Sequence, residues 1–316
     1  MSKKLSVLVL LAILVLTGFV LPAQAQEPHT FYWISHGSEG DPIWIFAING
    51  AKTASDSLGV KLNASFHHGD IASQKEAFNT AIAAGADGIA VSSPEVGVLT
   101  DEVKLAKEKG IPVVFFNTDD PATGRDAYVG ANVEKVGQMW AQYLVDNNLV
   151  KEGDKVWMPV EVPGATYGAD ETKGIASVFD PLGIKYEVFD AKYDPIETLQ
   201  NMTDYLTAHG GEINAMIGLG DMVTGYTQKA FEAVGWEPGK IPVVGWGNSL
   251  DTANAVKAGY VNAAMWQYPD SQGFMPIVLL EMAAKGQAIG YDVYTSGLYT
   301  KDSVDPYIEL TKQMSQ

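Results

Sequence analysis

The 316-residue chain contains no cysteine. This absence excludes disulfide frameworks, cysteine-ligated zinc, iron–sulfur clusters and thiol nucleophiles. Arginine is almost absent as well, because Arg125 is the single arginine of the sequence. Bidentate clamping of phosphate or carboxylate groups is mainly performed by arginine, so we do not expect a phosphorylated or strongly acidic ligand.

Positive charge is scarce overall. The sequence has 21 Lys and Arg against 38 Asp and Glu, which gives a formal net charge of −17. Nucleic acids and anionic membrane surfaces bind cationic faces, so we expect neither as a partner. The remaining composition, 47% hydrophobic and 19% charged, is typical of a globular protein. The length predicts two domains, each large enough to bury a core.

The first 25 residues have the pattern of an export signal. Two lysines at positions 3 and 4 are followed by an almost wholly apolar stretch over 5–21 and by the small-x-small sequence Ala23-Gln24-Ala25. The apolar stretch is short and ends at Pro22, which favours a cleaved signal peptide over a membrane anchor. We therefore expect cleavage near Ala25 and a periplasmic location.

Short apolar runs alternate with amphipathic stretches along the rest of the chain, a pattern typical of parallel strands joined by crossover helices. Strands are predicted at 31–35, 61–66, 88–92, 113–117, 155–160, 185–189, 215–218, 243–245 and 263–267. Helices are predicted at 42–58, 71–84, 98–109, 133–148, 171–179, 196–208, 222–233, 250–258 and 273–284. Several glycines stand at or just past these helix ends, where left-handed caps are expected: Gly59, Gly85, Gly110, Gly183, Gly235, Gly259 and Gly286.

About half of the strand–helix units precede residue 130, which predicts an α/β fold with two similar lobes. Ligands of open parallel sheets bind beyond the carboxyl ends of the strands. The turns after the predicted strands are rich in Asp, Asn, Ser, Trp and Tyr. Neutral polar groups beside aromatic faces suit a polyhydroxylated ligand.

Several short motifs add a family resemblance: Gly40-Asp41-Pro42-Ile43-Trp44, Ala86-Asp87-Gly88-Ile89-Ala90-Val91-Ser92-Ser93-Pro94, Gly110-Ile111-Pro112-Val113-Val114, Tyr193-Asp194, Leu206-Thr207-Ala208-His209, Val243-Val244-Gly245-Trp246 and Gln267-Tyr268-Pro269-Asp270. The order and spacing of these motifs resemble those of the periplasmic sugar-binding proteins of ABC transporters (the ribose-binding-like group, type I periplasmic binding fold). The resemblance extends over about residues 28–310. The resemblance implies two doubly wound parallel-sheet lobes joined by a three-segment hinge, with crossings near residues 130, 267 and 290. The N-terminal lobe is then 26–130 plus 268–290, and the C-terminal lobe 131–267 plus 291–316, after a signal peptide over 1–25.

The resemblance implies a binding protein rather than an enzyme. Such a protein captures a neutral monosaccharide or sugar alcohol between the lobes, without a cofactor and as a monomer, and delivers it to the membrane permease of an ABC importer. Other readings stay open: a receptor that feeds a chemotaxis or sensor system, a binder of a nucleoside or furanone signal, and an exported carbohydrate-active enzyme. An amine-bearing sugar also stays open, because four acids stand in the candidate turns: Asp41, Asp119, Asp170 and Asp221.

In the first lobe, the family's ligand contacts match five positions. Asp41 matches an asparagine that touches sugar, although it also suits a helix N-cap. Trp44 matches one of a pair of aromatic rings that sandwich the sugar, and Ser93 matches a polar pocket residue. Asn117 and Thr118 stand where ribose binders have an Asp-Arg pair that hydrogen-bonds to sugar hydroxyls, so these hydrogen bonds are expected to differ in this chain.

In the second lobe, Tyr167 and Asp170 are the candidates in a loop where ribose binders have a sugar-gripping arginine. Tyr193 matches an aromatic that closes over the sugar. Asp221 lies one position from the family's asparagine contact, which aligns with Gly220, and a helix N-cap is again the alternative role.

The last candidates are Trp246, Asn248 and Gln267. Trp246 and Asn248 replace a Phe-Asp pair, and Gln267 matches the hinge glutamine. Two arginines and two aspartates that contact the sugar in ribose-binding proteins have no counterpart in this sequence, so we do not expect ribose in particular.

His67-His68 does not predict a metal site, because neighbouring residues of a strand point to opposite faces. We expect no metal and no catalytic arrangement.

Overall fold

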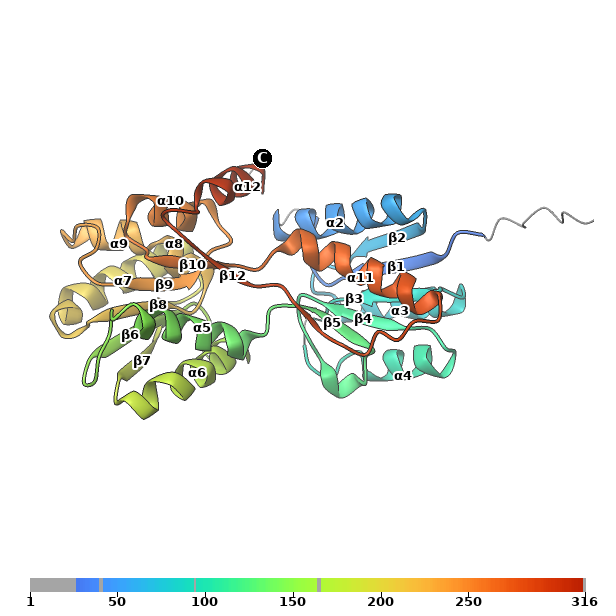
Figure 1. Cartoon of the computed structure of the whole chain (residues 1–316), viewed down its shortest axis with the longest axis horizontal. Helices are drawn as coiled ribbons and strands as arrows, with labels where there is room; N and C mark the ends of the chain where they lie inside the picture. The colour runs from blue at the N-terminus through green and yellow to red at the C-terminus, as the bar shows by residue number, and fades with distance from the viewer. Residues whose placement is uncertain (1–26, 40–41, 94, 164–165, 315–316) are drawn as a thin grey trace, which may run out of the picture.

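The computed structural model describes residues 27–39, 42–93, 95–163 and 166–314. The expected signal peptide and the candidate ligand contact Asp41 lie outside these residues. Two α/β lobes lie side by side (Figure 1), and each contains a sheet of six strands. The described ranges include no helix that is long and apolar enough to span a membrane.

The N-terminal lobe contains a parallel sheet with the strand order β11-β5-β4-β3-β1-β2. Its strands are β1 (Thr30–Ser35), β2 (Lys61–Phe66), β3 (Gly88–Val91), β4 (Val113–Phe116), β5 (Ala127–Gly130) and β11 (Val293–Tyr294). The helical elements are α2 (Pro42–Leu58), α3 (Ile71–Ala83), α4 (Thr100–Glu108), the 3₁₀ turn η1 (Pro121–Thr123) and α11 (Pro269–Ala284). The central strands β3, β4 and β5 are buried throughout, as strands covered on both faces are.

The C-terminal lobe repeats this order as β12-β10-β9-β8-β6-β7. Its strands are β6 (Lys155–Val160), β7 (Lys185–Asp190), β8 (Ala215–Gly218), β9 (Val243–Trp246), β10 (Ala263–Trp266) and β12 (Gly297–Thr300). Its helical elements are α5 (Val133–Asp146), α6 (Thr166–Phe179), η2 (Asp180–Leu182), α7 (Pro195–His209), η3 (Gly210–Glu212), α8 (Asp221–Gly225), α9 (Thr227–Ala233), α10 (Leu250–Ala258) and α12 (Asp305–Met314). The predicted fold class is confirmed, with one addition: β12 runs antiparallel to β10 at the sheet edge.

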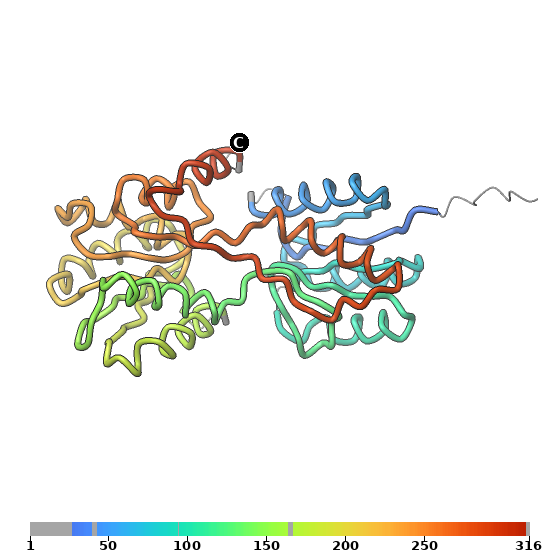
Figure 2. Tube along the Cα trace, viewed as in Figure 1, coloured from blue at the N-terminus to red at the C-terminus, as the bar shows by residue number. Residues whose placement is uncertain are grey.

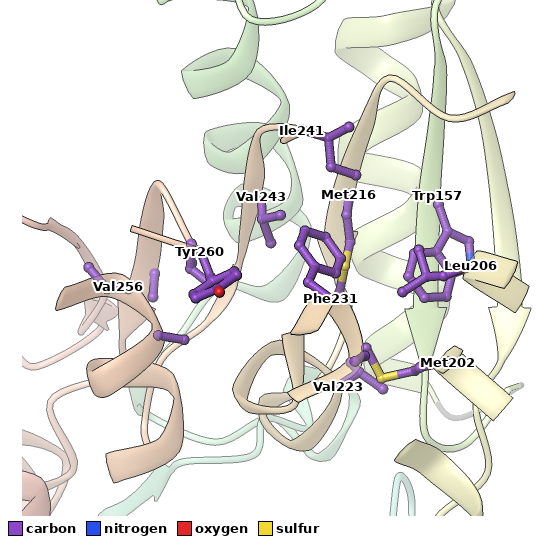
Figure 3. Packing of buried hydrophobic residues seen from close by; sticks show 14 of the residues in the cluster. Trp157, Met202, Leu206, Met216, Val223, Phe231, Ile241, Val243, Val256 and Tyr260 are labelled. Atoms are coloured by element: carbon purple, nitrogen blue, oxygen red, sulfur yellow. The ribbon is translucent and has the colours of Figure 1, made fainter. Parts of the chain in front are cut away.

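Each lobe buries its own apolar core against its sheet. In the C-terminal lobe, Trp157 stacks on Tyr205 with ring centroids 4.7 Å apart. Trp157 belongs to a buried cluster that also includes Phe231 (Figure 3). In the N-terminal lobe, Trp33 stacks on Phe116 at 4.8 Å. Fully buried aromatic side chains of this size contribute strongly to the stability of each lobe. The cores therefore hold the strand ends in fixed positions.

The chain crosses between the lobes three times: after β5, between β10 and α11, and between β11 and β12 (Figure 2). The third crossing was expected near residue 290, with the C-terminal lobe resuming at 291. The structure corrects this boundary. Val293 and Tyr294 pair with Val129 and Gly130 in the first sheet, so the chain leaves the N-terminal lobe only after Tyr294.

Two helices that contribute to the cleft differ from their predicted bounds. Helix α6 begins at Thr166 instead of Glu171, so most of the expected loop over 163–170 forms helical turns. The single helix predicted over 222–233 is divided at Tyr226 into α8 and α9. Tyr167 of α6 and Asp221 of α8 both line the cleft described below.

Candidate functional site: a cleft between the lobes

A cleft with a volume of about 1290 Å³ lies between the two lobes. Residues from the carboxyl ends of strands in both sheets line it, together with residues of the first and second crossings. Five of the lining residues are aromatic: Trp44, Tyr167, Tyr193, Tyr226 and Trp246. Four are acidic: Glu161, Asp194, Asp221 and Asp251. None of the described lining residues is Lys, Arg or His.

Nine of the twelve predicted ligand contacts line this cleft: Trp44, Asn117, Thr118, Tyr167, Tyr193, Asp221, Trp246, Asn248 and Gln267. Ser93 does not line it. This residue is buried, and its hydroxyl donates a 2.7 Å hydrogen bond to the carbonyl of Glu95. Asp170 is also not among the lining residues. The structure therefore brings nine distant positions together, and their contact with a ligand stays a prediction.

The N-terminal wall carries Trp44 on the first turn of α2. Its indole packs edge-to-face with His36 at 4.9 Å and with Phe116 at 6.2 Å, and only 6% of the residue is exposed. Burial lowers the pKa of His36 to about 4, although the residue is hydrogen-bonded to Ser92. His36 is therefore neutral at neutral pH and adds no charge behind this wall.

The C-terminal wall carries Trp246 at the end of β9. Its Nε1–H donates a 2.7 Å hydrogen bond to Glu171 Oε1, and its ring packs edge-to-face with Trp140 at 5.7 Å. Glu171 is completely buried, and burial raises the pKa of its carboxyl well above the usual range. These contacts fix the orientation of the indole, which suits it to stacking against the C–H face of a ligand.

Asp221 and Asn248 organise the loop after β9. The N–H of Asn248 donates to Asp221 Oδ1 at 2.7 Å, and Asn248 Oδ1 accepts from the N–H of Gln267 at 3.2 Å. The alternative role considered for Asp221, a helix N-cap, does not apply, because Gly220 occupies the N-cap position and Asp221 is the first helical residue. Burial raises the pKa of the Asp221 carboxyl.

The hinge side of the cleft contains a buried amide network centred on Gln272 of α11. Gln272 Nε2 donates to the carbonyl of Gln267 at 2.9 Å and lies 3.1 Å from Thr295 Oγ1. Its Oε1 accepts from Asn117 Nδ2 at 3.0 Å. Gln272 therefore connects the second and third crossings with the end of β4.

The single arginine is engaged away from the cleft. The Arg125 guanidinium donates to Asp119 Oδ2 and to Asp292 Oδ1, both at 2.7 Å. Bidentate pairing of this kind is strong and geometrically specific. Asp119 was one of the acids considered for pairing with an amine-bearing sugar, but it forms an ion pair with Arg125 instead.

Glu161 is the most prominent lining residue that the sequence analysis missed. It follows β6 directly, and only 7% of the residue is exposed. Burial raises the pKa of its carboxyl, with a smaller contribution from Asp221. The available signal was an acidic residue immediately after a buried strand.

The described residues include no group of three or more His, Cys, Asp or Glu side chains arranged to hold a metal ion. The ring nitrogens of His67 are instead within 2.8 Å of the hydroxyls of Ser65 and Ser73. The chemistry that the cleft offers is hydrogen bonding to polar groups and stacking on aromatic faces.

Comparison with known proteins gives consistent matches. The D-xylose-binding periplasmic protein of Escherichia coli is 28% identical over 240 residues, which are 74% of this chain and 69% of that protein. The ribose import binding protein of Haemophilus influenzae is 23% identical over 281 residues, which are 87% and 92% of the two chains.

The fold is shared with solved structures. A solute-binding protein of an ABC transporter from Burkholderia graminis, in complex with D-arabinose, has a TM-score of 0.74 and 24% sequence identity. The match covers 88% of this chain and 96% of that one. Residues 31–288 match the family model described as the periplasmic binding protein domain. The chain therefore belongs to the periplasmic binding protein domain family.

Proposed function

We propose that this chain is an exported solute-binding protein of an ABC importer that captures a monosaccharide or sugar alcohol in the cleft between its lobes. The composition of the cleft carries this proposal. Aromatic rings and neutral or acidic polar groups line the cleft, without a described cation. Rings stack on C–H faces, and amide and carboxylate oxygens accept hydrogen bonds from hydroxyls.

The relatives support the same class of ligand. Those reported above are named for D-xylose and ribose, and the solved neighbour contains D-arabinose. All three are neutral sugars, which agrees with a cleft that offers no described Lys, Arg or His for an anionic ligand.

Capture follows from the distribution of contacts over two lobes. Trp44 and Thr118 come from the N-terminal lobe, whereas Tyr193 and Trp246 come from the C-terminal lobe. A sugar that contacts both walls binds the closed arrangement more tightly than the open one and shifts the population toward closure. The closed form is the state that a membrane permease would distinguish. An epimer leaves a buried polar group unpaired at a cost of about 1–3 kcal/mol, which provides specificity.

The nine predicted contacts that line the cleft form the proposed ligand set. The proposal also includes export with cleavage near Ala25, delivery to a membrane permease, a monomeric state, no nucleic-acid partner, and binding without catalysis. The acidic composition supports the expectation on nucleic acid, since only 21 Lys and Arg stand against 38 Asp and Glu.

A thermal-shift screen tests the proposal. The protein without residues 1–25 is unfolded and refolded to remove any bound solute, and is then melted with pentoses, hexoses, alditols, amino sugars and nucleosides. A ligand at about 100 times its Kd adds about 2.7 kcal/mol to the free energy of unfolding. We expect one or a few sugars or alditols to raise the Tm. Stabilisation by a nucleoside alone, or turnover of aryl glycosides, would overturn the proposal.

A further inference from the structure

Glu161 occupies a position that combines burial with access to the cleft. It directly follows β6, which lies between β7 and β8, and residues that follow each of these three strands line the cleft between the lobes. The residue lines the cleft although only 7% of it is exposed. A carboxyl group this buried requires hydrogen-bond donors, because an unpaired buried charge is costly.

The carboxyl group is held in a defined orientation. The N–H groups of Met222 and Val223 donate to Oε1 at 3.0 and 3.2 Å. The other oxygen, Oε2, lies over Gly220, where an added Cβ would come within 1.6 Å of it. Gly220 has φ −160° and ψ 163°, an extended backbone that any residue adopts. Space for the carboxyl, rather than backbone geometry, therefore accounts for the glycine.

We propose that Glu161 is a specificity-determining residue whose Oε2 accepts hydrogen bonds from hydroxyl groups of the bound sugar or sugar alcohol. This inference rests on the proposed function. A carboxylate accepts several hydrogen bonds, and bonds to a charged acceptor are stronger than those between neutral groups. Because the backbone already orients Glu161, binding requires little additional ordering of this side chain.

The surroundings of Glu161 agree with a ligand as the source of donors. The described lining residues include no Lys, Arg or His that would pair with the carboxylate. Tyr167 and Gly220 line the cleft from the same lobe as Glu161, so this side of the cleft also contains an aromatic ring for stacking. Because only 7% of Glu161 is exposed, few water molecules reach the carboxyl, and hydroxyl groups of a ligand would restore the lost hydrogen bonds.

Calorimetric titration of deoxy analogues tests the assignment. D-xylose, D-ribose, D-arabinose, D-glucose, D-galactose and xylitol, with their monodeoxy analogues, are titrated into the wild type and Glu161→Ala. In the wild type, one monodeoxy analogue of the binding sugar is expected to bind at least about tenfold more weakly than its parent. In Glu161→Ala, the parent sugar is weakened by about the same factor, and the difference between parent and analogue disappears.

Each other result overturns the inference in a recognisable way. Unchanged affinity of Glu161→Ala, or an equal weakening of the parent and all its analogues, removes the specificity role and leaves the proposed function standing. If the wild type binds none of these compounds, and nothing in the wider thermal-shift panel stabilises it, the proposed function fails and the inference fails with it. Circular dichroism and the Tm of the unliganded variant show whether the fold is retained.

Gly220→Ala provides a second, independent test of the role of Glu161. The added methyl displaces the Glu161 carboxyl without removing it, because the three atoms nearest to that methyl all belong to Glu161. We expect at least about tenfold weaker binding in the wild-type background and no further weakening in the Glu161→Ala background. Gly211→Ala is the matched control, since a Cβ there meets no atom within 4 Å. Equal weakening by Gly220→Ala in both backgrounds would contradict the proposal.

Discussion

Trp246 Nε1 lies 2.7 Å from Glu171 Oε1, and this hydrogen bond joins a ring of the cleft wall to a completely buried carboxyl group. The second oxygen of Glu171, Oε2, has no hydrogen-bond partner among the described residues. A buried acceptor without a partner costs about 1–3 kcal/mol, and more when it is charged. The orientation of the ring is therefore maintained at a cost to the stability of the C-terminal lobe.

Glu171→Gln is expected to stabilise the protein at high pH. The pKa of Glu171 is raised in the folded state, so the folded protein holds a proton that the unfolded chain releases above its ordinary pKa of about 4.3. The wild type consequently loses stability as pH rises from about 4 toward the folded pKa, whereas the variant does not. Urea unfolding should show equal stability at pH 4 and an advantage of at least about 1 kcal/mol for the variant at pH 8.

The control for this prediction is Glu309→Gln on α12, where the glutamate side chain is 69% exposed and pairs with Lys312. Its effect should stay within about 0.5 kcal/mol at both pH values. A Glu171→Gln variant that is less stable than the wild type at pH 8 would contradict the account of the buried carboxyl.

His36 gives a pH dependence of the opposite sign. Its pKa falls from 6.5 to about 4 on folding, so between these pH values His36 is protonated in the unfolded chain and neutral in the folded chain. Stability is full above pH 6.5 and is lost as pH falls toward 4. Relative to His36→Asn, the wild type should lose up to about 3 kcal/mol between pH 7 and pH 4. His209→Asn, at an exposed helix end, is the control. A constant difference between wild type and His36→Asn over this range would refute the prediction.

Gln272 is expected to be the most sensitive position of the hinge. Gln272→Ala removes the donor to the Gln267 carbonyl and leaves the side chains of Asn117 and Thr295 without their buried partner. We expect a loss of about 3 kcal/mol in the free energy of unfolding, measured in urea. The exposed Gln287→Ala in the turn after α11 should change stability by no more than about 0.5 kcal/mol. Similar small effects for both variants would show that the amide network does not stabilise the crossings.

The charge of the cleft predicts discrimination against anionic sugars. Its charged lining residues are acidic, and the only arginine is paired with Asp119 and Asp292. Adding a carboxylate or phosphate to a sugar that binds should weaken binding at least about 100-fold, since like charges repel and no bidentate clamp is present. Calorimetric titration compares D-glucose with D-glucuronate and D-ribose with D-ribose 5-phosphate. Equal affinities within a pair that binds would contradict this reading of the cleft.

Much of the fold is predictable because its signals are local. Alternating apolar and amphipathic runs predicted the paired parallel strands, and all seven glycines expected as helix caps have positive φ. Strands β5, β11 and β12 were not predicted. β11 has only two residues and β12 pairs antiparallel with β10, so their strand character depends on partners distant in sequence. This dependence also explains the displaced third crossing.

The site is predictable only in part, for a related reason. Parallel strands end at one edge of a sheet, so residues after strands meet in the cleft even when a single turn carries a weak signal. Glu161 was missed because its orientation depends on Gly220 and the start of α8. Asp221 was predicted to replace the family's asparagine, which aligns with Gly220. In the structure, the space that a side chain at Gly220 would need is occupied by the Glu161 carboxyl.

Capture of a sugar between two closing lobes shortens the distance across the mouth of the cleft, and this distance can be measured. The chain has no cysteine, so Ala72→Cys and Glu197→Cys introduce the only two labelling sites. Both are exposed at the starts of helices that follow β2 and β7, the strands farthest from the crossings in each sheet.

Energy transfer between dyes at these two sites is measured during titration with D-xylose, D-ribose, D-arabinose, D-glucose, D-galactose and sugar alcohols. We expect at least one of these compounds to raise the transfer efficiency and to saturate it at one molecule per chain. Unchanged transfer with every compound, in a protein that melts cooperatively, would contradict capture between closing lobes.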